Sequence, residues 1–185
     1  LTGFLIAIPV GLLLATLITS FPLLNAAMSP YITFLVTTPL VSLIPLLMLM
    51  MGYGMNMRIT TVVIQSFAVI NMNACTGFNN VPTLRRELMQ SVGASRFQSY
   101  RMMILPSAAT DIITGLRLAA IFATTTCISV EYNAGNTGLG SQIIKYSQYL
   151  QTTQSFACIF YVTVIGLIMY GLITLIQKKI VNWEE

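Results

Sequence analysis

Apolar residues run through most of this chain in long blocks and do not alternate with polar ones. Residues 1–57 carry no charged side chain, and neither do residues 59–84 or 146–177. Blocks of 18 or more mostly apolar residues are typical of helices that cross a lipid bilayer. The pattern therefore predicts an all-α polytopic membrane protein.

Five membrane-spanning helices are expected, because the blocks are too long and alternate too little for β-barrel strands. Pro39 and Pro45 fall inside the second span, and each removes a backbone donor, so a kink or local unwinding is expected there. The five expected spans are Thr2–Ser20, Tyr31–Met51, Ile59–Thr76, Pro106–Val130 and Thr153–Gln177.

Small residues recur at every fourth position in two of these spans. Such rows allow helix backbones to approach closely inside a membrane. Packing within one subunit is favoured over an interface between subunits. The rows are Gly3, Ala7, Gly11 and Ala15 in the first span, and Gly115, Ala119, Ala123 and Cys127 in the fourth.

Composition supports the membrane class. Hydrophobic residues make up 56% of the chain and charged residues 8%, against about 25% charged in a typical soluble domain. The alternative, a soluble protein of buried helices, would have too little polar surface to stay dissolved. The net charge of +4 does not indicate nucleic-acid binding, because the basic residues sit in short loops, where they orient membrane helices.

The sequence lacks the residues of several kinds of catalytic site. It has no His and no GxxxxGK[ST] phosphate loop, so neither an imidazole base nor nucleotide hydrolysis by this chain is expected. Its acidic residues are scattered, so no metal site is expected. The cysteines are far apart and read as small buried hydrophobes. The stretch 135–141 is glycine-rich but does not match the dinucleotide fingerprint. We therefore expect a non-enzymatic chain without a cofactor of its own.

Basic residues predict the orientation of the chain. Residues 79–103 hold four arginines and the tail holds Lys178 and Lys179, so both segments are expected to be cytoplasmic. Two spans separate them, so the two assignments agree. Residues 52–58 and 131–152 then face outward, with Arg58 and Lys145 as minor exceptions. By this count the first span begins outside, and a further helix is expected upstream of it.

The segment Leu84–Pro106 is charged and partly amphipathic. Pro82 and Thr83 suit a helix start, and apolar residues at 84, 88 and 92 share one face of the helix that follows. Gly93 is suited to a turn with positive φ, and Ser95 to the cap of a second helix. The pattern predicts a helix–Gly–helix unit, either lying on anionic lipid or docking into a groove on a partner protein.

This segment resembles the cytoplasmic EAA loop of ABC importer permeases. The pattern is Glu-Ala-Ala, three residues, Gly, nine residues, then Ile-x-Leu-Pro. Here Glu87 begins it, Gly93 follows six positions later, and residues 103–106 close it as Met-Ile-Leu-Pro. Leu88 and Met89 replace the two alanines, which makes the helix surface bulkier. The resemblance implies a coupling loop over residues 79–105, with its contacts at Leu84, Arg85, Glu87, Leu88, Gly93, Ala94, Ser95, Arg96 and Pro106.

The resemblance extends along the chain to the nitrate/sulfonate/taurine-type branch. It is carried by Pro39, Pro45 and Gly52-Tyr53-Gly54, by Asn73 and Gly77, by Gly115-Leu116-Arg117, and by Glu131 with Gly138-Leu139-Gly140. It implies a single transmembrane permease domain over residues 1–185, in a bacterial cytoplasmic membrane.

The resemblance also implies partners and a mechanism. Two permease subunits, expected to be a homodimer, would form the pathway in membrane lipid. Two ATPase subunits binding ATP and Mg²⁺ would move the loops, and an external solute-binding protein would deliver the solute. No nucleic acid is expected. A continuous helix on both sides of Pro106 is expected to carry the movement into the fourth span.

Candidate pathway or gate residues are Asn73, Arg117, Glu131, Gly138 and Gly140. An ionisable group inside a membrane suggests function, yet for Arg117 we favour pairing with a carbonyl or carboxylate of a neighbouring helix, and for Asn73 a hydrogen bond between helices. Glu131 and the glycines suggest an outer gate or re-entering turn, or else a flexible external loop. Asp111 and Arg117 are six residues apart and should face different ways.

The expected solute is a small anion such as a sulfonate, taurine or nitrate, or a vitamin-precursor heterocycle, since no residue decides between them. Two rival functions stay open. An ATP-independent secondary transporter would show inverted repeats, and none is evident. A scaffold subunit would only anchor a partner.

Overall fold

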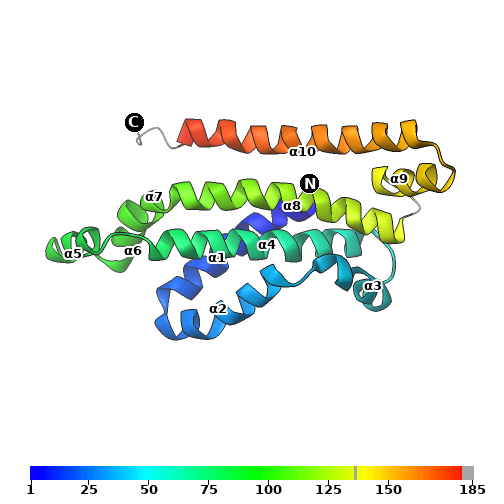
Figure 1. Ribbon diagram of the computed structural model, residues 1–185. Coiled ribbons are helices and arrows are strands. Elements are labelled where there is room, and N and C mark those ends of the chain that lie inside the picture. Colours follow the sequence, from blue (N-terminus) through cyan, green and yellow to red (C-terminus); the bar gives the residue numbers. More distant parts are fainter. Residues whose placement is uncertain (136, 181–185) are drawn as a thin grey trace.

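Figure 1 shows the computed structural model as a bundle of long helices with short helices at both ends. The structure describes residues 1–135 and 137–180, and every element in them is helical. The predicted cytoplasmic C-terminus, residues 181–185, lies outside the described residues. The elements are α1 (Thr2–Ser20), α2 (Pro22–Thr37), α3 (Leu40–Met51), α4 (Met55–Asn79), α5 (Thr83–Ser91), α6 (Arg96–Ser99), the π-helical turn η1 (Tyr100–Ile104), α7 (Leu105–Ser107), α8 (Ala109–Ala134), α9 (Leu139–Gln148) and α10 (Thr152–Ile180).

Helix α4 is the centre of the bundle and packs along both α1 and α8. The row of small residues in α1 faces α4, and all four of its members are buried. A Cβ added at Gly3 would lie 2.9 Å from the Ile59 carbonyl oxygen, and one at Gly11 would lie 2.9 Å from the Ile70 side chain. The predicted packing of this row within one subunit is confirmed.

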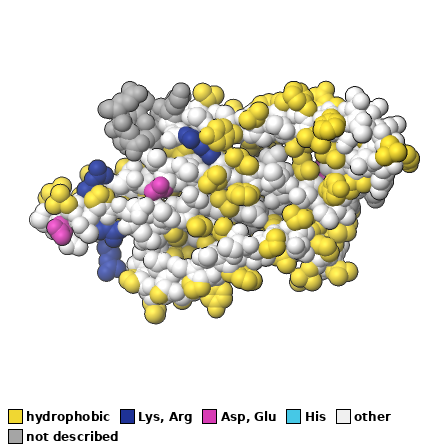
Figure 2. Space-filling view, viewed as in Figure 1, with side chains coloured by type: hydrophobic (Ala, Val, Ile, Leu, Met, Phe, Trp, Pro, Cys, Tyr) yellow, Lys and Arg dark blue, Asp and Glu magenta, His cyan; other side chains and the backbone are white. Residues whose placement is uncertain are grey.

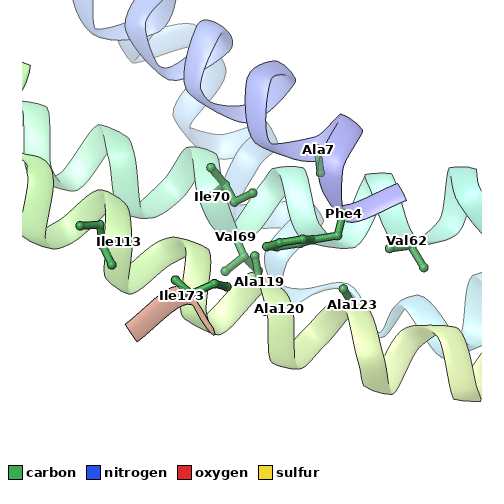
Figure 3. Close-up of a cluster of buried hydrophobic side chains, with 10 residues drawn as sticks. All are labelled: Phe4, Ala7, Val62, Val69, Ile70, Ile113, Ala119, Ala120, Ala123 and Ile173. Atoms are coloured by element: carbon green, nitrogen blue, oxygen red, sulfur yellow. The ribbon is translucent and has the colours of Figure 1, made fainter. Parts of the chain in front are cut away.

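The largest core cluster lies where α1, α4 and α8 meet (Figure 3). Phe4 reaches from α1 towards α4 and α8, where Val69 and Ala120 are buried. Ile173 is the one buried residue of α10 in this cluster. Helix α10 is otherwise peripheral, because only 6% of its apolar span is buried.

Four helices are long and apolar enough to cross a membrane, and a fifth span is reached if the bent pair α2 and α3 counts as one. The predicted first span has the observed bounds of α1. The third and fifth spans were predicted too short, since α4 covers Met55–Asn79 and α10 covers Thr152–Ile180. The all-α membrane fold is confirmed.

The predicted second span, Tyr31–Met51, is wrong in its start, whereas the kink or unwinding expected at its prolines is found at Pro39. Helix α2 begins at Pro22, and the chain then bends by 96° between α2 and α3. The bend falls at Thr38, which is extended with φ −66° and ψ 125°, because a residue before proline avoids the helical conformation. Pro39 therefore ends one helix and precedes the next, whereas Pro45 lies inside α3 without breaking it.

The fourth span does not begin at Pro106 as predicted. The long helix α8 starts at Ala109, after η1, α7 and a turn at Ala108. The Ala108 N–H donates to the Ile104 carbonyl at 3.0 Å, and the Ile112 N–H donates to the Ala108 carbonyl at 2.9 Å. The continuous helix expected on both sides of Pro106 is thus interrupted by a turn at Ala108, across which the backbone stays hydrogen-bonded. Proline has no N–H to donate to the preceding turn, so an irregular turn beside Pro106 is expected physically.

Candidate functional site

The two sets of candidate residues lie at opposite ends of the bundle. Helices α5 and α6 project at one end, and α9 lies at the other (Figure 1). Figure 2 shows that the charged side chains on this face are confined to the half of the molecule nearest α5. Residues 79–105 are called the coupling loop below.

The coupling loop has the local structure that its sequence predicts. Helix α5 begins at Thr83, and Gly93 has a φ of +69°, which L-residues with a side chain rarely adopt. The Ser95 hydroxyl accepts the Gln98 N–H at 3.3 Å, while the Ser95 N–H donates to Gln98 Oε1 at 2.8 Å. This reciprocal capping box starts α6.

Two arginines attach α5 to the bundle. Arg86 Nη2 donates to the carbonyl of Phe78 in α4 at 2.9 Å. Arg85 Nη1 donates to the Ser107 hydroxyl in α7 at 2.9 Å. Because α4 and α7 lie on either side of the loop in the sequence, these bonds join its entry to its exit. The arginines therefore position the loop.

No described residue of the chain covers the apolar face of α5. Leu84 is 76% exposed, Leu88 62% and Val92 69%. Glu87 and Arg96 are also exposed, and Ala94 is half-buried. Apart from half-buried Met89, charged and polar side chains occupy the rest of α5, so the helix is amphipathic with its apolar side open. An apolar side of this kind is stabilised when a partner or a lipid surface covers it.

The exit of the loop is packed firmly against α1 and α4. The Tyr100 hydroxyl lies 2.8 Å from Thr16 Oγ1 of α1. The Tyr100 ring lies 5.8 Å from the ring of Phe78, which is buried in α4. Half-buried Pro106 follows six residues later, in α7. These contacts fix the exit of the loop against α1 and α4 just before the start of α8.

The other end of the bundle holds an ion pair between α4 and α8. Arg58 Nη1 and Glu131 Oε1 are 3.5 Å apart, and the two side chains are 18% and 14% exposed. Arg58 Nη2 also donates to the Tyr53 hydroxyl, and to the Thr137 carbonyl at 3.2 Å and hydroxyl at 3.0 Å. The guanidinium thus joins the start of α4 to the segment after α8.

The glycines of this region fold directly over Glu131. The Gly140 N–H donates to Glu131 Oε2 at 3.0 Å. Gly138 has a φ of +110°, and an added Cβ would collide with the Glu131 carboxylate. We call Arg58, Glu131, Thr137, Gly138 and Gly140 the distal cluster. Asn136, between its members, lies outside the described residues.

The segment after the distal cluster is not the flexible external loop that one interpretation of the sequence gave. It forms α9, which packs against α8 and α10. Glu131 does not end a helix either, because α8 continues to Ala134. The carboxylate contacts the turn before α9 through the Gly140 N–H.

Asn73 and Arg117 are not part of either site. Asn73 Nδ2 donates to the Val69 carbonyl of its own helix at 2.9 Å, and Asn71 makes the bond between helices, to the Gly11 carbonyl at 3.2 Å. The guanidinium of Arg117 lies 5.7 Å from the centre of the Tyr170 ring on α10. Its partner is therefore an aromatic ring, where a carbonyl or carboxylate was expected.

Arg58 is the site residue that sequence reasoning missed. It was treated as an exception to the charge rule, although it pairs with a residue 73 positions away. A signal was present, because Arg58 is the first charged side chain after 57 uncharged residues. A lone charge at the edge of a span calls for a partner.

Comparison with known proteins identifies the family. The model of the family described as "Binding-protein-dependent transport system inner membrane component" matches residues 7–182. The taurine transport system permease protein TauC of Escherichia coli is 28% identical over 97% of this chain, which spans 64% of that protein. The formylaminopyrimidine transport permease protein ThiX of Halalkalibacterium halodurans is 25% identical, with 99% of this chain and 73% of that protein covered.

A solved structure shows the same fold. A chain of the MetNI methionine ABC transporter, crystallised in inward-facing conformations, superposes with a TM-score of 0.70 at 22% identity, covering 98% of this chain and 87% of that one. At this identity the likeness concerns the fold alone. Taken with the family match over nearly the whole chain, the protein belongs to the binding-protein-dependent transport system inner membrane components, the permeases of ABC importers.

Proposed function

We propose that this chain is the permease subunit of an ATP-driven importer and that its coupling loop binds a separate ATPase subunit. Two ATPase subunits, holding ATP and Mg²⁺, act on two permease copies, and an external solute-binding protein supplies the solute. The coupling loop and the C-terminus face the cytoplasm, in agreement with the arginines of residues 79–103. The chain itself catalyses no reaction.

The observation that carries the proposal is the open apolar face of α5 on a firmly attached loop. Leu84, Leu88 and Val92 are each more than 60% exposed, while Arg85 and Arg86 bind the loop to α7 and α4. A helix that only rested on lipid would need no such attachment. A helix that transmits force needs both a surface for the partner and a connection to the bundle.

The connection continues into the membrane. From α6 the chain passes through η1 and α7 into α8, with hydrogen bonds across the turn at Ala108. The ATPase changes the conformational equilibrium only through contacts that differ between its two states. A loop joined to α8 by a hydrogen-bonded backbone, and to α1 through Tyr100, converts such contacts into a shift of the bundle.

The distal cluster closes the other end of the pathway. Glu131, Gly138 and Gly140 hold the turn before α9 against α8, and Arg58 ties that turn to α4. The Glu131 carboxylate binds the Arg58 guanidinium and accepts the Gly140 N–H. We therefore assign these residues to closing the bundle and not to binding solute.

The solute is a small organic molecule or anion. The relatives are named for taurine and for formylaminopyrimidine, which supports a sulfonate, taurine, nitrate or a vitamin-precursor heterocycle as the cargo of this chain.

The test compares two substitutions on opposite faces of α5. The complex with its ATPase subunits is reconstituted in liposomes, and ATP hydrolysis and uptake of these solutes are measured. Leu88→Asp adds a charge to the open apolar face and is expected to lower both rates at least about tenfold, the effect of losing about 1.4 kcal/mol of binding. Gln90→Asp adds the same charge to the polar face and should leave both rates within about twofold of the original. Equal rates for both variants would contradict docking through α5, and uptake without ATP would indicate a secondary transporter.

A further inference from the structure

Arg117 has no counter-charge among the described residues, although it lies in a membrane-spanning helix. Its guanidinium faces the Tyr170 ring of α10 at 5.7 Å. Its Nε–H is buried and has no hydrogen-bond partner among the described residues. The ion pair that these residues form lies at the other end of the bundle, in the distal cluster. Asp111, the acidic residue nearest to Arg117 in the sequence, faces α4, where its side chain borders Gly77.

The depth of Arg117 allows its guanidinium to reach a membrane surface. Helix α8 has 26 residues, so it is about 39 Å long and extends about 4–5 Å beyond each side of a hydrocarbon core of about 30 Å. Arg117 is eight residues after Ala109, which places its Cα about 7–8 Å inside the core. Because helical side chains point back towards the helix N-terminus, the guanidinium lies near the headgroups on the side of the coupling loop.

Arg117 and Tyr170 lie over an apolar base at the edge of the bundle (Figure 1). Ile113 of α8 and Ile173 of α10 are buried together in the core cluster, each within one turn of Arg117 or Tyr170. Helix α10 is peripheral, and Tyr170 is 39% exposed. A tyrosine at this level is typical of the boundary between hydrocarbon and headgroups. A lipid can therefore reach this position sideways from the bilayer.

A second group without a partner lies further along the same face of α10. Gln177 follows Tyr170 by seven residues, or two helical turns, so the two side chains share one face. Gln177 Oε1 is buried and has no hydrogen-bond partner among the described residues. A cation with a free donor is thus followed, about 10 Å closer to the coupling-loop end of α10, by a free acceptor. The α8–α10 seam is the name used below for Ile113, Arg117, Tyr170, Ile173 and Gln177.

The headgroup of an anionic phospholipid matches the chemistry of the α8–α10 seam. Phosphate oxygens bind a guanidinium through paired, charge-assisted hydrogen bonds, and the Tyr170 hydroxyl is a further donor. Gln177 Oε1 can accept a hydrogen bond from a glycerol hydroxyl of the headgroup. Basic pockets between membrane helices on the cytoplasmic side bind acidic lipids. The sequence also places Lys178 and Lys179 directly after Gln177, which adds positive charge at this end of α10.

We propose that the α8–α10 seam binds an anionic phospholipid of the cytoplasmic leaflet, with the lipid phosphate on Arg117 and Tyr170 and a headgroup hydroxyl on Gln177. The proposal goes beyond the proposed function, because this lipid is neither the solute nor a partner subunit. The leaflet follows from the proposed orientation, whereas the binding itself depends only on the seam. The bound lipid joins α10, which is otherwise little buried, to α8.

The test measures lipid binding by the chain purified from membranes with the subunits that accompany it. Native mass spectrometry compares phosphatidylglycerol with phosphatidylcholine of the same acyl chains. Phosphatidylglycerol should bind at least about tenfold more tightly, and Arg117→Gln should remove that preference. Lys145→Gln is the matched control, because it removes one positive charge from an exposed position on α9. It should leave both affinities within about twofold of the original.

Two milder variants test the same contacts if Arg117→Gln does not fold. Tyr170→Phe keeps the aromatic ring beside the guanidinium and removes only the hydroxyl, so it should weaken phosphatidylglycerol binding about threefold. Arg117→Lys keeps the charge and loses the paired donors, so it should also weaken binding about threefold. Unchanged binding in both variants would overturn the proposal.

The remaining outcomes separate the lipid from a soluble anion and from the proposed function. Equal binding of the two lipids, or an unchanged preference in Arg117→Gln, would overturn the lipid site. Displacement of phosphatidylglycerol by an excess of taurine, nitrate or inorganic phosphate would also overturn it, because Arg117 would then serve a soluble anion. Leu88→Asp tests the docking of α5 separately and should leave the lipid preference unchanged.

Discussion

The two ends of the bundle differ in how their charged and apolar side chains are bonded or covered. In the distal cluster, Arg58 and Glu131 bind each other and the backbone of the turn before α9. In the coupling loop, the arginines hold the loop in place while the apolar face of α5 stays open. The charged groups of the distal cluster are bonded to described residues of the chain, whereas no described residue covers the apolar face of α5.

This difference separates two roles. A cluster whose groups are all used internally contributes to stability, and substitutions in it should lower the melting temperature. An open apolar helix contributes little to the fold of the isolated chain, so substitutions there should impair coupling and leave stability nearly unchanged. The predictions below test this separation, from the largest expected effect to the smallest.

Gly138→Ala should be the most damaging change to the fold. The residue has φ +110°, and the new Cβ would collide with the Glu131 carboxylate. We expect a loss of about 3 kcal/mol in the free energy of unfolding, or about 6–12 °C in melting temperature in detergent. Gly171→Ala is the control, because no atom lies within 4 Å of its added Cβ and alanine favours helix. An unchanged melting temperature for Gly138→Ala would show that the turn does not depend on Glu131.

The Arg58–Glu131 pair should contribute next. Arg58→Met or Glu131→Gln leaves a half-buried charge without its partner and should cost about 2 kcal/mol each. The double variant should lose less than the sum of the two, with a coupling energy of about 1–2 kcal/mol in a double-mutant cycle. Additive losses would mean that the two side chains act independently.

A comparison of the sequence with the structure shows which features of the molecule can be predicted from neighbouring residues. The bounds of α1, the turn at Gly93 and the cap at Ser95 were predicted, because each depends on residues a few positions apart. Two features could not be predicted from residues that are close together in the sequence. Pro39 breaks its helix and Pro45 does not, since the packing of α3 against α4 and α8 decides between them. Arg58 and Glu131 meet only when α4 packs against α8. No spacing between neighbouring residues predicts that contact.

Gly93 should show the smallest effect on stability and a large effect on coupling. Its φ of +69° is tolerated by asparagine but not by valine, and its added Cβ would meet no atom within 4 Å. Gly93→Val should therefore strain only the turn, by about 1–2 kcal/mol, and should lower ATP-dependent uptake severalfold. Gly93→Asn should preserve uptake. Equal uptake by both variants would show that the angle between α5 and α6 is unimportant.

The most direct test of the account identifies the molecule that contacts the apolar face of α5 in intact membranes. A photoreactive benzoylphenylalanine is placed at Leu88 on the open face, or at Gln90 on the polar face, and the adducts formed on illumination of intact membranes are identified by mass spectrometry. The account predicts a covalent adduct between position 88 and an ABC ATPase subunit, and little or none from position 90. Adducts of position 88 with lipid alone would contradict it, because α5 would then rest on the membrane surface and bind no motor protein.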